Sequence, residues 1–150
     1  MPKHKVPLAL LGFTESEIMQ KQDEYGKHYK KGRVLDKFKS YLKAGEAELK
    51  EYRKSKNKDN TTTLAEAGEK LWGSVNHLIE LKSGKSLTTS KAVWDEVHLL
   101  GDQHLITIYE TAYSLHQFFY GYTGAHLEEI TERADQVING LKGYLNANRE

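Results

Sequence analysis

Residues 64–82, LAEAGEKLWGSVNHLIELK, decide the fold that this chain is expected to adopt. Apolar side chains recur along this stretch every three or four residues, as they do on one face of an α-helix. The apolar positions are Leu64, Leu71, Trp72, Val75, Leu78 and Ile79. The opposite side is polar: Glu66, Glu69, Lys70, Asn76, His77 and Glu80. Because the apolar sector is wide, we expect a central helix rather than a peripheral one.

Small residues within the same stretch indicate that a neighbouring helix approaches its backbone closely. They are Ala65, Ala67, Gly68, Gly73 and Ser74. We expect Thr63 to cap the helix N-terminus, with Glu66 completing a capping box. Gly84, which follows Ser83, is the usual residue for ending a helix. The polar residues 54–62 before this helix are typical of a connection between antiparallel helices.

Helical patterns cover most of the remaining chain, and period-2 alternation never persists for more than a few residues. We expect further helices at about 15–31, 33–53, 91–100, 103–120 and 125–146, the first of them capped by Thr14 with Glu17. The sequence therefore predicts an all-α, single-domain bundle of five to six helices over residues 14–150. Residues 1–13 are expected to form an N-terminal arm.

Composition restricts the class of protein. The chain has 150 residues, enough for one core without cross-links, and no cysteine, which excludes disulfides and thiolate metal sites. The absence of cysteine fits a reducing cytoplasm, and no apolar stretch is long enough for a membrane span. Residues 1–58 carry 15 basic and 8 acidic residues, whereas residues 59–150 carry 7 and 13. This asymmetry favours either a face that binds polyanions, two halves that attract each other, or merely solvated charge.

Several basic residues in the first half alternate with aromatic ones, a pattern that suits phosphates and stacked bases. The candidate nucleic-acid-binding residues are Lys27, Lys30, Lys31, Arg33 and Arg53. The nearby rings of Phe38 and Tyr41, however, fall on the predicted core face of residues 33–53. A helix with a solvated lysine-rich face is therefore the alternative interpretation.

Metal-dependent and nucleophilic chemistry find little support. Helical metal bundles need two Glu-x-x-His motifs, and the nearest match here is the single pair Asp95 and His98. We therefore expect no metal and no cofactor, with His98 and His104 at the surface or at its boundary with the core. The serines lie in no nucleophile elbow, and no glycine-rich phosphate loop occurs.

His116 allows two interpretations. It falls on the predicted apolar line of residues 103–120, together with Leu105, Tyr109, Ala112 and Phe119. The preferred interpretation is a core histidine whose ring nitrogens are hydrogen-bonded. The alternative is a site residue beside Tyr113 and Tyr120, which lie three positions before it and four after it.

Two segments together resemble the archaeal PaREP family. Residues 67–75, AGEKLWGSV, look like that family's alanine-glutamate-lysine-leucine-tryptophan signature. Residues 114–121, SLHQFFYG, look like its leucine-histidine-x-x-phenylalanine-tyrosine stretch, which also precedes a last amphipathic helix. The resemblance covers roughly residues 35–146. Its matching positions are Glu69, Lys70, Trp72, His116, Phe119 and Tyr120.

The resemblance implies a HEPN-like helical domain, and members of that superfamily often dimerise. Many are ribonucleases whose signature is an arginine followed, after four to six residues, by a histidine. No histidine stands at that spacing after Arg33, Arg53 or Arg133, and the chain ends just after Arg149. The cleaving machinery therefore does not carry over to this chain, and no catalytic residue is assigned.

The expected function is a non-cleaving RNA- or nucleotide-binding module that forms a homodimer. Its candidate ligand-binding residues are Glu69, Lys70, His77, His116 and Tyr120. The first alternative is a protein-interaction module without nucleic-acid binding. A ribonuclease with a non-standard site, or another enzyme using a polar pocket around these residues, is the second.

Overall fold

The computed structural model describes residues 30–55, 61–121 and 126–147, and within them five α-helices and no strands. The helices are α2 (Lys31–Lys54), α3 (Thr62–Ser83), α4 (Ser90–Leu100), α5 (Gln103–Phe119) and α6 (Leu127–Ala147). The all-α bundle that the sequence predicts is thus confirmed. The expected helix at 15–31, its Thr14 cap and the arm at 1–13 lie outside the described residues.

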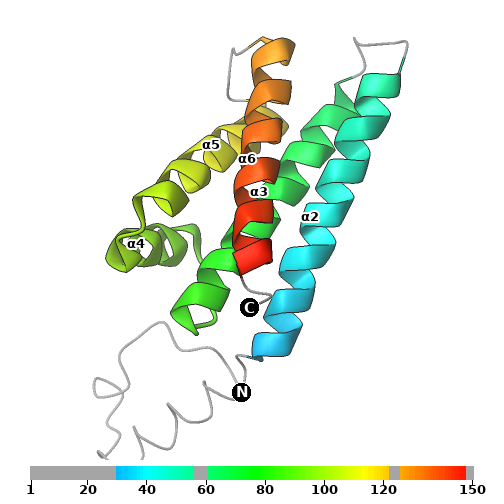
Figure 1. Ribbon diagram of the computed structural model, residues 1–150. Coiled ribbons are helices and arrows are strands. Elements are labelled where there is room, and N and C mark those ends of the chain that lie inside the picture. Colours follow the sequence, from blue (N-terminus) through cyan, green and yellow to red (C-terminus); the bar gives the residue numbers. More distant parts are fainter. Residues whose placement is uncertain (1–29, 56–60, 122–125, 148–150) are drawn as a thin grey trace, which may run out of the picture.

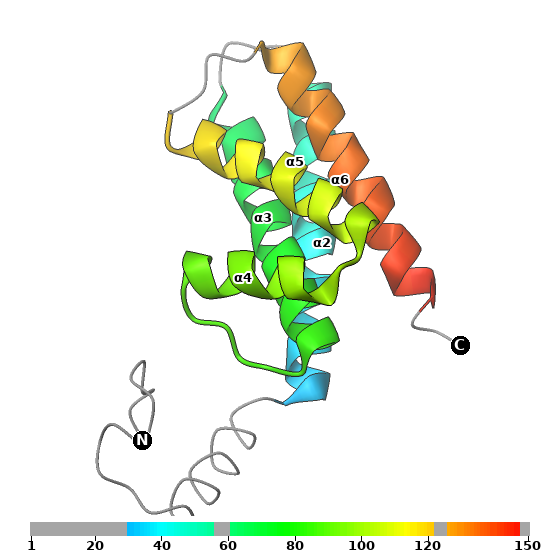
Figure 2. The same ribbon diagram turned by 90° about the vertical axis from the view of Figure 1, so that its left-hand side faces the viewer.

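Four long helices alternate in direction, and the short α4 lies across them (Figures 1 and 2). Helix α3 packs against α2, α4, α5 and α6 and also contributes the most buried residues. Its apolar positions Leu64, Leu71, Val75, Leu78 and Ile79 are all fully buried. The wide apolar sector therefore predicts the central place of α3 correctly, because such a sector is shielded from water only by neighbours on several sides.

Glycines let the helices approach one another closely. A Cβ atom on Gly45 of α2 would lie 2.7 Å from Leu71 Cδ2 and 3.3 Å from the Ala67 carbonyl oxygen of α3. On the other side of α3, a Cβ on Gly68 would lie 3.1 Å from Leu115 Cβ of α5. The expectation that small residues of α3 let a neighbouring helix approach holds at Gly68, on the side of α5. On the side of α2, the glycine at the close contact belongs to α2.

The ends of the helices follow local chemistry, with one correction. Gly84 and Gly101 end α3 and α4 at φ 69° and 68°, a left-handed conformation that favours glycine. The expected cap at Thr63 is wrong: Thr63 lies inside the first turn of α3, and Thr61 is the N-cap, without a side-chain capping bond. Any of three successive threonines can begin this helix, so the sequence does not distinguish between them. The Ala65 N–H donates to the Thr61 carbonyl oxygen, and this first helical hydrogen bond makes Thr61 the N-cap.

Three side chains differ in exposure from the sequence expectation. Glu80, predicted on the polar side of α3, is buried, and its Oε2 accepts a hydrogen bond of 2.8 Å from the Leu87 N–H. The loop after α3 folds back over this carboxylate, which the helix pattern alone does not reveal. Tyr41 and Phe119, predicted on core faces, are 38% and 39% exposed: the Tyr41 ring stacks on His77, which is itself only partly buried, and Phe119 is the last residue of α5.

Candidate functional site

The start of α2 carries a basic surface around a shallow hollow. The hollow has a volume of about 330 Å³ and is lined by Arg33, Asp36, Lys37, Ser40, Tyr41, Ala44 and Lys70. Arg33 and Lys37 are exposed, one helical turn apart, and neither forms an ion pair with another described residue. Lys30 and Lys31 are exposed just before them. Lys27, the remaining candidate of this group, lies outside the described residues.

An aromatic pair borders the same hollow. The rings of Tyr41 and His77 stack with centroids 5.3 Å apart and planes 19° apart. The Tyr41 ring lies against α3 at Gly73, where an added Cβ would make an ordinary contact with it at 3.5 Å. The His77 ring is itself fixed by a hydrogen bond, because its Nδ1 lies 2.7 Å from Glu80 Oε1. A fixed, partly exposed ring therefore stands beside unpaired cations, a combination that suits a base and its phosphate.

Two candidate cations are instead bound to carboxylates. Arg53 donates to both oxygens of Asp135 on α6, at 3.0 and 2.5 Å, and this contact raises the pKa of the guanidinium. It also lies 20 residues after Arg33, about 30 Å along the helix axis, and so outside the basic surface. Lys70 Nζ lies 2.5 Å from Glu48 Oε1 of α2. Arg53 and Lys70 thus connect helices.

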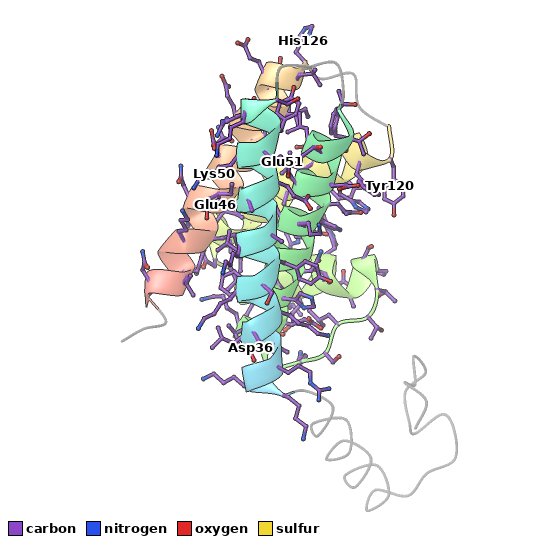
Figure 3. All side chains as sticks on the ribbon, turned by 90° about the vertical axis from the view of Figure 1, so that its right-hand side faces the viewer. Asp36, Glu46, Lys50, Glu51, Tyr120 and His126 are labelled. Atoms are coloured by element: carbon purple, nitrogen blue, oxygen red, sulfur yellow. The ribbon has the colours of Figure 1, made fainter. Side chains whose placement is uncertain are left out.

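The exposed face of α2 carries both signs of charge along its length. Figure 3 shows Asp36 near its start, Lys50 and Glu51 further along, and Glu46 on the side of α6. Lys142 of α6 pairs with Glu46. Within the described part of the chain, the first turns of α2 combine an aromatic ring with several cations that have no ion pair there, and this region is therefore the candidate interface for nucleic acid.

Glu69 and His116 come together on another face of α3. His116 Nδ1 lies 2.8 Å from Glu69 Oε1, and both side chains are about one quarter exposed. The His116 ring stacks on Trp72 at 5.0 Å and meets the edge of the Tyr120 ring at 5.0 Å. His116 is therefore half-buried rather than a core residue, and the neighbours expected for a site residue are present. Lys70, directed towards α2, does not join this group.

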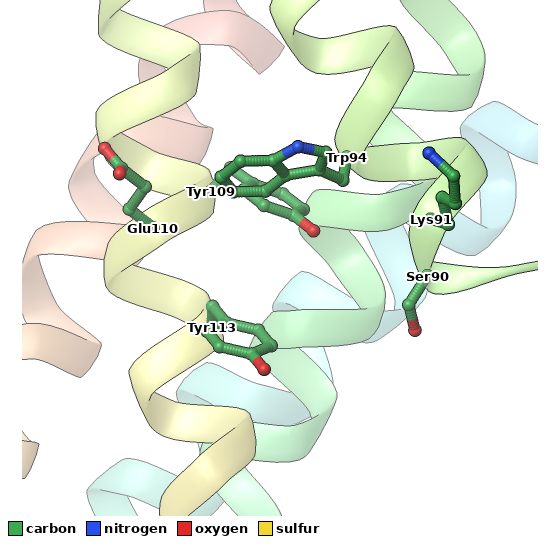
Figure 4. A pocket seen from close by; sticks show the side chains of 6 residues that line it. All are labelled: Ser90, Lys91, Trp94, Tyr109, Glu110 and Tyr113. Carbon is green, nitrogen blue, oxygen red and sulfur yellow. The ribbon is translucent and has the colours of Figure 1, made fainter.

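The sequence interpretation did not identify a second aromatic hollow, which lies between α4 and α5 (Figure 4). It has a volume of about 560 Å³ and is lined by Ser90, Lys91, Trp94, Tyr109, Glu110 and Tyr113. Burial raises the pKa of the Tyr109 phenol, and the neighbouring Tyr113 raises it further. The spacing of Tyr109 and Tyr113 places them on one face of α5, but only the crossing of α4 brings Trp94 to them.

Nothing in the described residues supports a metal centre or a nucleophile. No group of three or more histidine or acidic side chains in that part of the chain could hold a metal ion. Asp95 pairs with Lys91, and His98 Nδ1 lies 2.7 Å from the Trp94 carbonyl oxygen. Ser114 donates its hydroxyl to the Thr111 carbonyl oxygen. His98 and His104 are exposed, as expected.

Comparisons with known proteins leave the family open. No protein-family model matches the chain, and no curated protein or solved structure is significantly similar to it. None of the helices in the described ranges combines the length and the apolar character needed to cross a bilayer.

Proposed function

We propose that this chain is a non-cleaving RNA- or nucleotide-binding module, and that its relation to the archaeal PaREP family and HEPN-like domains is real. The observation that carries the proposal is the hollow at the start of α2, where Arg33 and Lys37 lie beside the Tyr41 ring and form no ion pair with a described residue. Guanidinium and ammonium groups bind phosphate oxygens, and a fixed phenol ring offers a face to a base. Lys30 and Lys31 extend the positive surface. A cytoplasmic location is part of this proposal.

The non-cleaving half of the proposal rests on the surroundings of the histidines. Acid–base cleavage of RNA needs two positioned groups that exchange protons with the substrate. No histidine follows an arginine at the spacing that the resembled ribonucleases use. We therefore expect the His116→Ala variant to bind RNA as the parent does, with neither protein cleaving it.

A salt series of RNA binding tests the proposal directly. The triple variant Lys30→Ala, Lys31→Ala, Arg33→Ala should bind a labelled single-stranded RNA more weakly. Its logarithmic salt slope should be flatter by about 0.7 for each phosphate group that the variant no longer binds. The matched control is Lys50→Ala, Lys54→Ala, Lys85→Ala, which removes the same charge at other exposed positions. Fluorescence anisotropy between about 50 and 200 mM salt supplies the measurement.

The outcomes separate the proposal from its alternatives. Unchanged affinity in the first triple variant would leave a protein-interaction module as the explanation of the basic surface. Equal losses in both triple variants would show that only net charge matters. Metal-independent RNA cleavage that disappears in His116→Ala would revive the enzyme interpretation.

The protein-interaction alternative is favoured by a separate observation. Tyr113 and Phe119 of α5 and Tyr120, the C-cap of this helix, are 44%, 39% and 54% exposed. Exposed rings gathered on one helix commonly mark an interface. A homodimer through this end of α5 is compatible with RNA binding at α2, because the two surfaces lie on different helices.

A further inference from the structure

The aromatic hollow between α4 and α5 has the size and lining of a ligand site. Its volume of about 560 Å³ lies within the range of small-molecule sites in proteins. Trp94 and Tyr109 form adjoining walls, with centroids 6.0 Å apart and planes inclined by 57°. Tyr113 forms another wall and is itself supported by Trp72 at 5.6 Å. Inclined rings enclose a space from several sides, whereas parallel rings form a slot.

The Tyr109 side chain gives a second, independent indication of a ligand. Tyr109 is only 3% exposed, and its hydroxyl has no hydrogen-bond partner among the described residues. Figure 4 shows this hydroxyl directed to the space between Trp94 and Tyr113. The hydroxyl oxygen itself is open to solvent, since among the described residues the buried side-chain oxygen or nitrogen without a partner is Glu48 Oε2. A polar group of a ligand in the hollow can therefore take the place of water as the hydrogen-bond partner of Tyr109.

The charge around the hollow selects the kind of ligand. Lys91 is compensated, because its Nζ lies 3.1 and 3.4 Å from the two oxygens of Asp95. Glu110, which lies on α5 across the hollow from Lys91 in Figure 4, forms no ion pair with a described residue. The uncompensated charge is therefore negative, and the faces of the aromatic walls are negative as well. Both features favour a cation and disfavour a phosphate.

The lining also excludes a bare metal ion. One carboxylate and a few hydroxyls are too few oxygen ligands for Ca²⁺ or Mg²⁺, whereas aromatic faces bind organic cations well. The volume is far larger than a single ion requires, so the cation should carry an apolar stem. A guanidinium group fits best, since it stacks flat on an aromatic ring while its N–H groups point outward in the plane.

We propose that this hollow binds an alkylguanidinium ion, such as the end of an arginine side chain. Its plane stacks on Trp94, its N–H groups donate to the Tyr109 hydroxyl oxygen, and its stem lies along Tyr113. The exposed Glu110 carboxylate at the edge of the hollow attracts the positive charge without a direct hydrogen bond. This site is separate from the basic surface of α2 and does not depend on RNA binding there.

An NMR titration of the folded full-length chain with n-butylguanidinium tests the proposal. The probe should shift the backbone amide signals of Tyr109, Glu110 and Tyr113 saturably, with a dissociation constant in roughly the millimolar range expected for so small a ligand. The uncharged isostere n-butylurea should bind at least about tenfold more weakly, because it lacks the attraction to the rings and to Glu110. Equal binding of n-butylurea would overturn the proposal.

Three variants and one control assign the effect to the hollow. Trp94→Ala and Glu110→Gln should each weaken binding about threefold or more, and Tyr109→Phe should do so while keeping the ring. Leu99→Ala is the matched control, because Leu99 is a 77% exposed apolar residue on the same helix as Trp94 and lines no part of the hollow. Unchanged affinity in all three variants, or a loss of the same size in Leu99→Ala, would contradict the proposal.

A titration with adenosine monophosphate tests the alternative ligand. If adenosine monophosphate shifts the same amide signals more strongly than n-butylguanidinium does, the proposal is overturned and the hollow is assigned to a nucleotide instead.

Discussion

Trp72 joins α3 to the aromatic residues of α5. Its ring is 8% exposed and contacts Tyr109, Tyr113 and His116, all on α5, at centroid distances of 5.0–5.6 Å. From its place on the apolar side of residues 64–82 we expect Trp72 to be buried against the helices predicted at 103–120 and 125–146, and the ring contacts confirm the first of these two neighbours. None of the ring contacts that the structure gives for Trp72 involves α6.

Replacing Trp72 with alanine should lower the free energy of unfolding by about 3–5 kcal/mol, since a large buried ring would leave a cavity. Urea denaturation measures the change. Trp94→Ala is the control. Because Trp94 is 47% exposed, this variant should lower the free energy of unfolding far less than Trp72→Ala does. Equal costs for the two variants would show that Trp72 does not anchor the core.

Two glycines in neighbouring helices should respond in opposite ways to the same substitution. Gly45→Ala places a methyl group 2.7 Å from Leu71 Cδ2 and 3.3 Å from a backbone oxygen, so we expect a net loss of about 1 kcal/mol despite the better helix propensity of alanine. Gly73→Ala meets only the Tyr41 ring, at 3.5 Å, and should be neutral or stabilising by up to about 1 kcal/mol. Thermal and urea unfolding compare them. A Gly45→Ala variant as stable as the parent would mean that α2 and α3 are packed less closely than described.

At the scale of elements, one hydrogen bond connects the start of α5 to α6. The Tyr144 hydroxyl donates to Asp102 Oδ2 at 2.5 Å, while Asp102 Oδ1 accepts from the Leu105 N–H and caps α5. The bond from Tyr144 is the main cause that lowers the pKa of Asp102 below its ordinary 3.8, and the charge of Lys82 contributes. Burial, followed by the contact with Asp102, raises the pKa of Tyr144.

The Tyr144→Phe variant should therefore be less stable than the parent by about 1–2 kcal/mol at neutral pH. Because the pKa of Asp102 is lowered in the folded state, its contribution is complete above pH 3.8 and is lost as the pH falls through the folded-state pKa. The difference between parent and variant should accordingly shrink below about pH 4. Tyr113→Phe, at an exposed position, is the control. A difference that stays constant from pH 7 to pH 2 would mean that the charged carboxylate does not strengthen the bond.

At the scale of the whole molecule, the exposed rings at the end of α5 favour association of two chains. The rings of Phe119 and Tyr120 meet edge to face at 5.0 Å, and both are more than one third exposed. We expect light scattering at micromolar concentration to give twice the mass of one chain. The double variant Phe119→Ser, Tyr120→Ser should shift it towards a single chain. A monomeric mass for the parent protein would decide against the dimer.

The sequence by itself determined the helices and the central place of α3. Both depend on local rules, because apolar spacing sets which face of a helix is buried, and Gly84 and Gly101 can take the left-handed conformation that ends one. Of the candidate site, it also predicted the aromatic neighbours of His116, since those lie on the same helix three and four residues away.

Only the tertiary structure decided which side chains from different helices meet. Glu69 and His116 are 47 positions apart, and Arg53 and Asp135 are 82 apart. The angle at which α4 crosses α5 places Trp94 beside Tyr109, and the loop after α3 buries Glu80. These contacts follow from the packing of the whole core, in which each helix is turned and shifted until most of its apolar face is covered. No local pattern in the sequence predicts these contacts, because they depend on the packing of all the helices together.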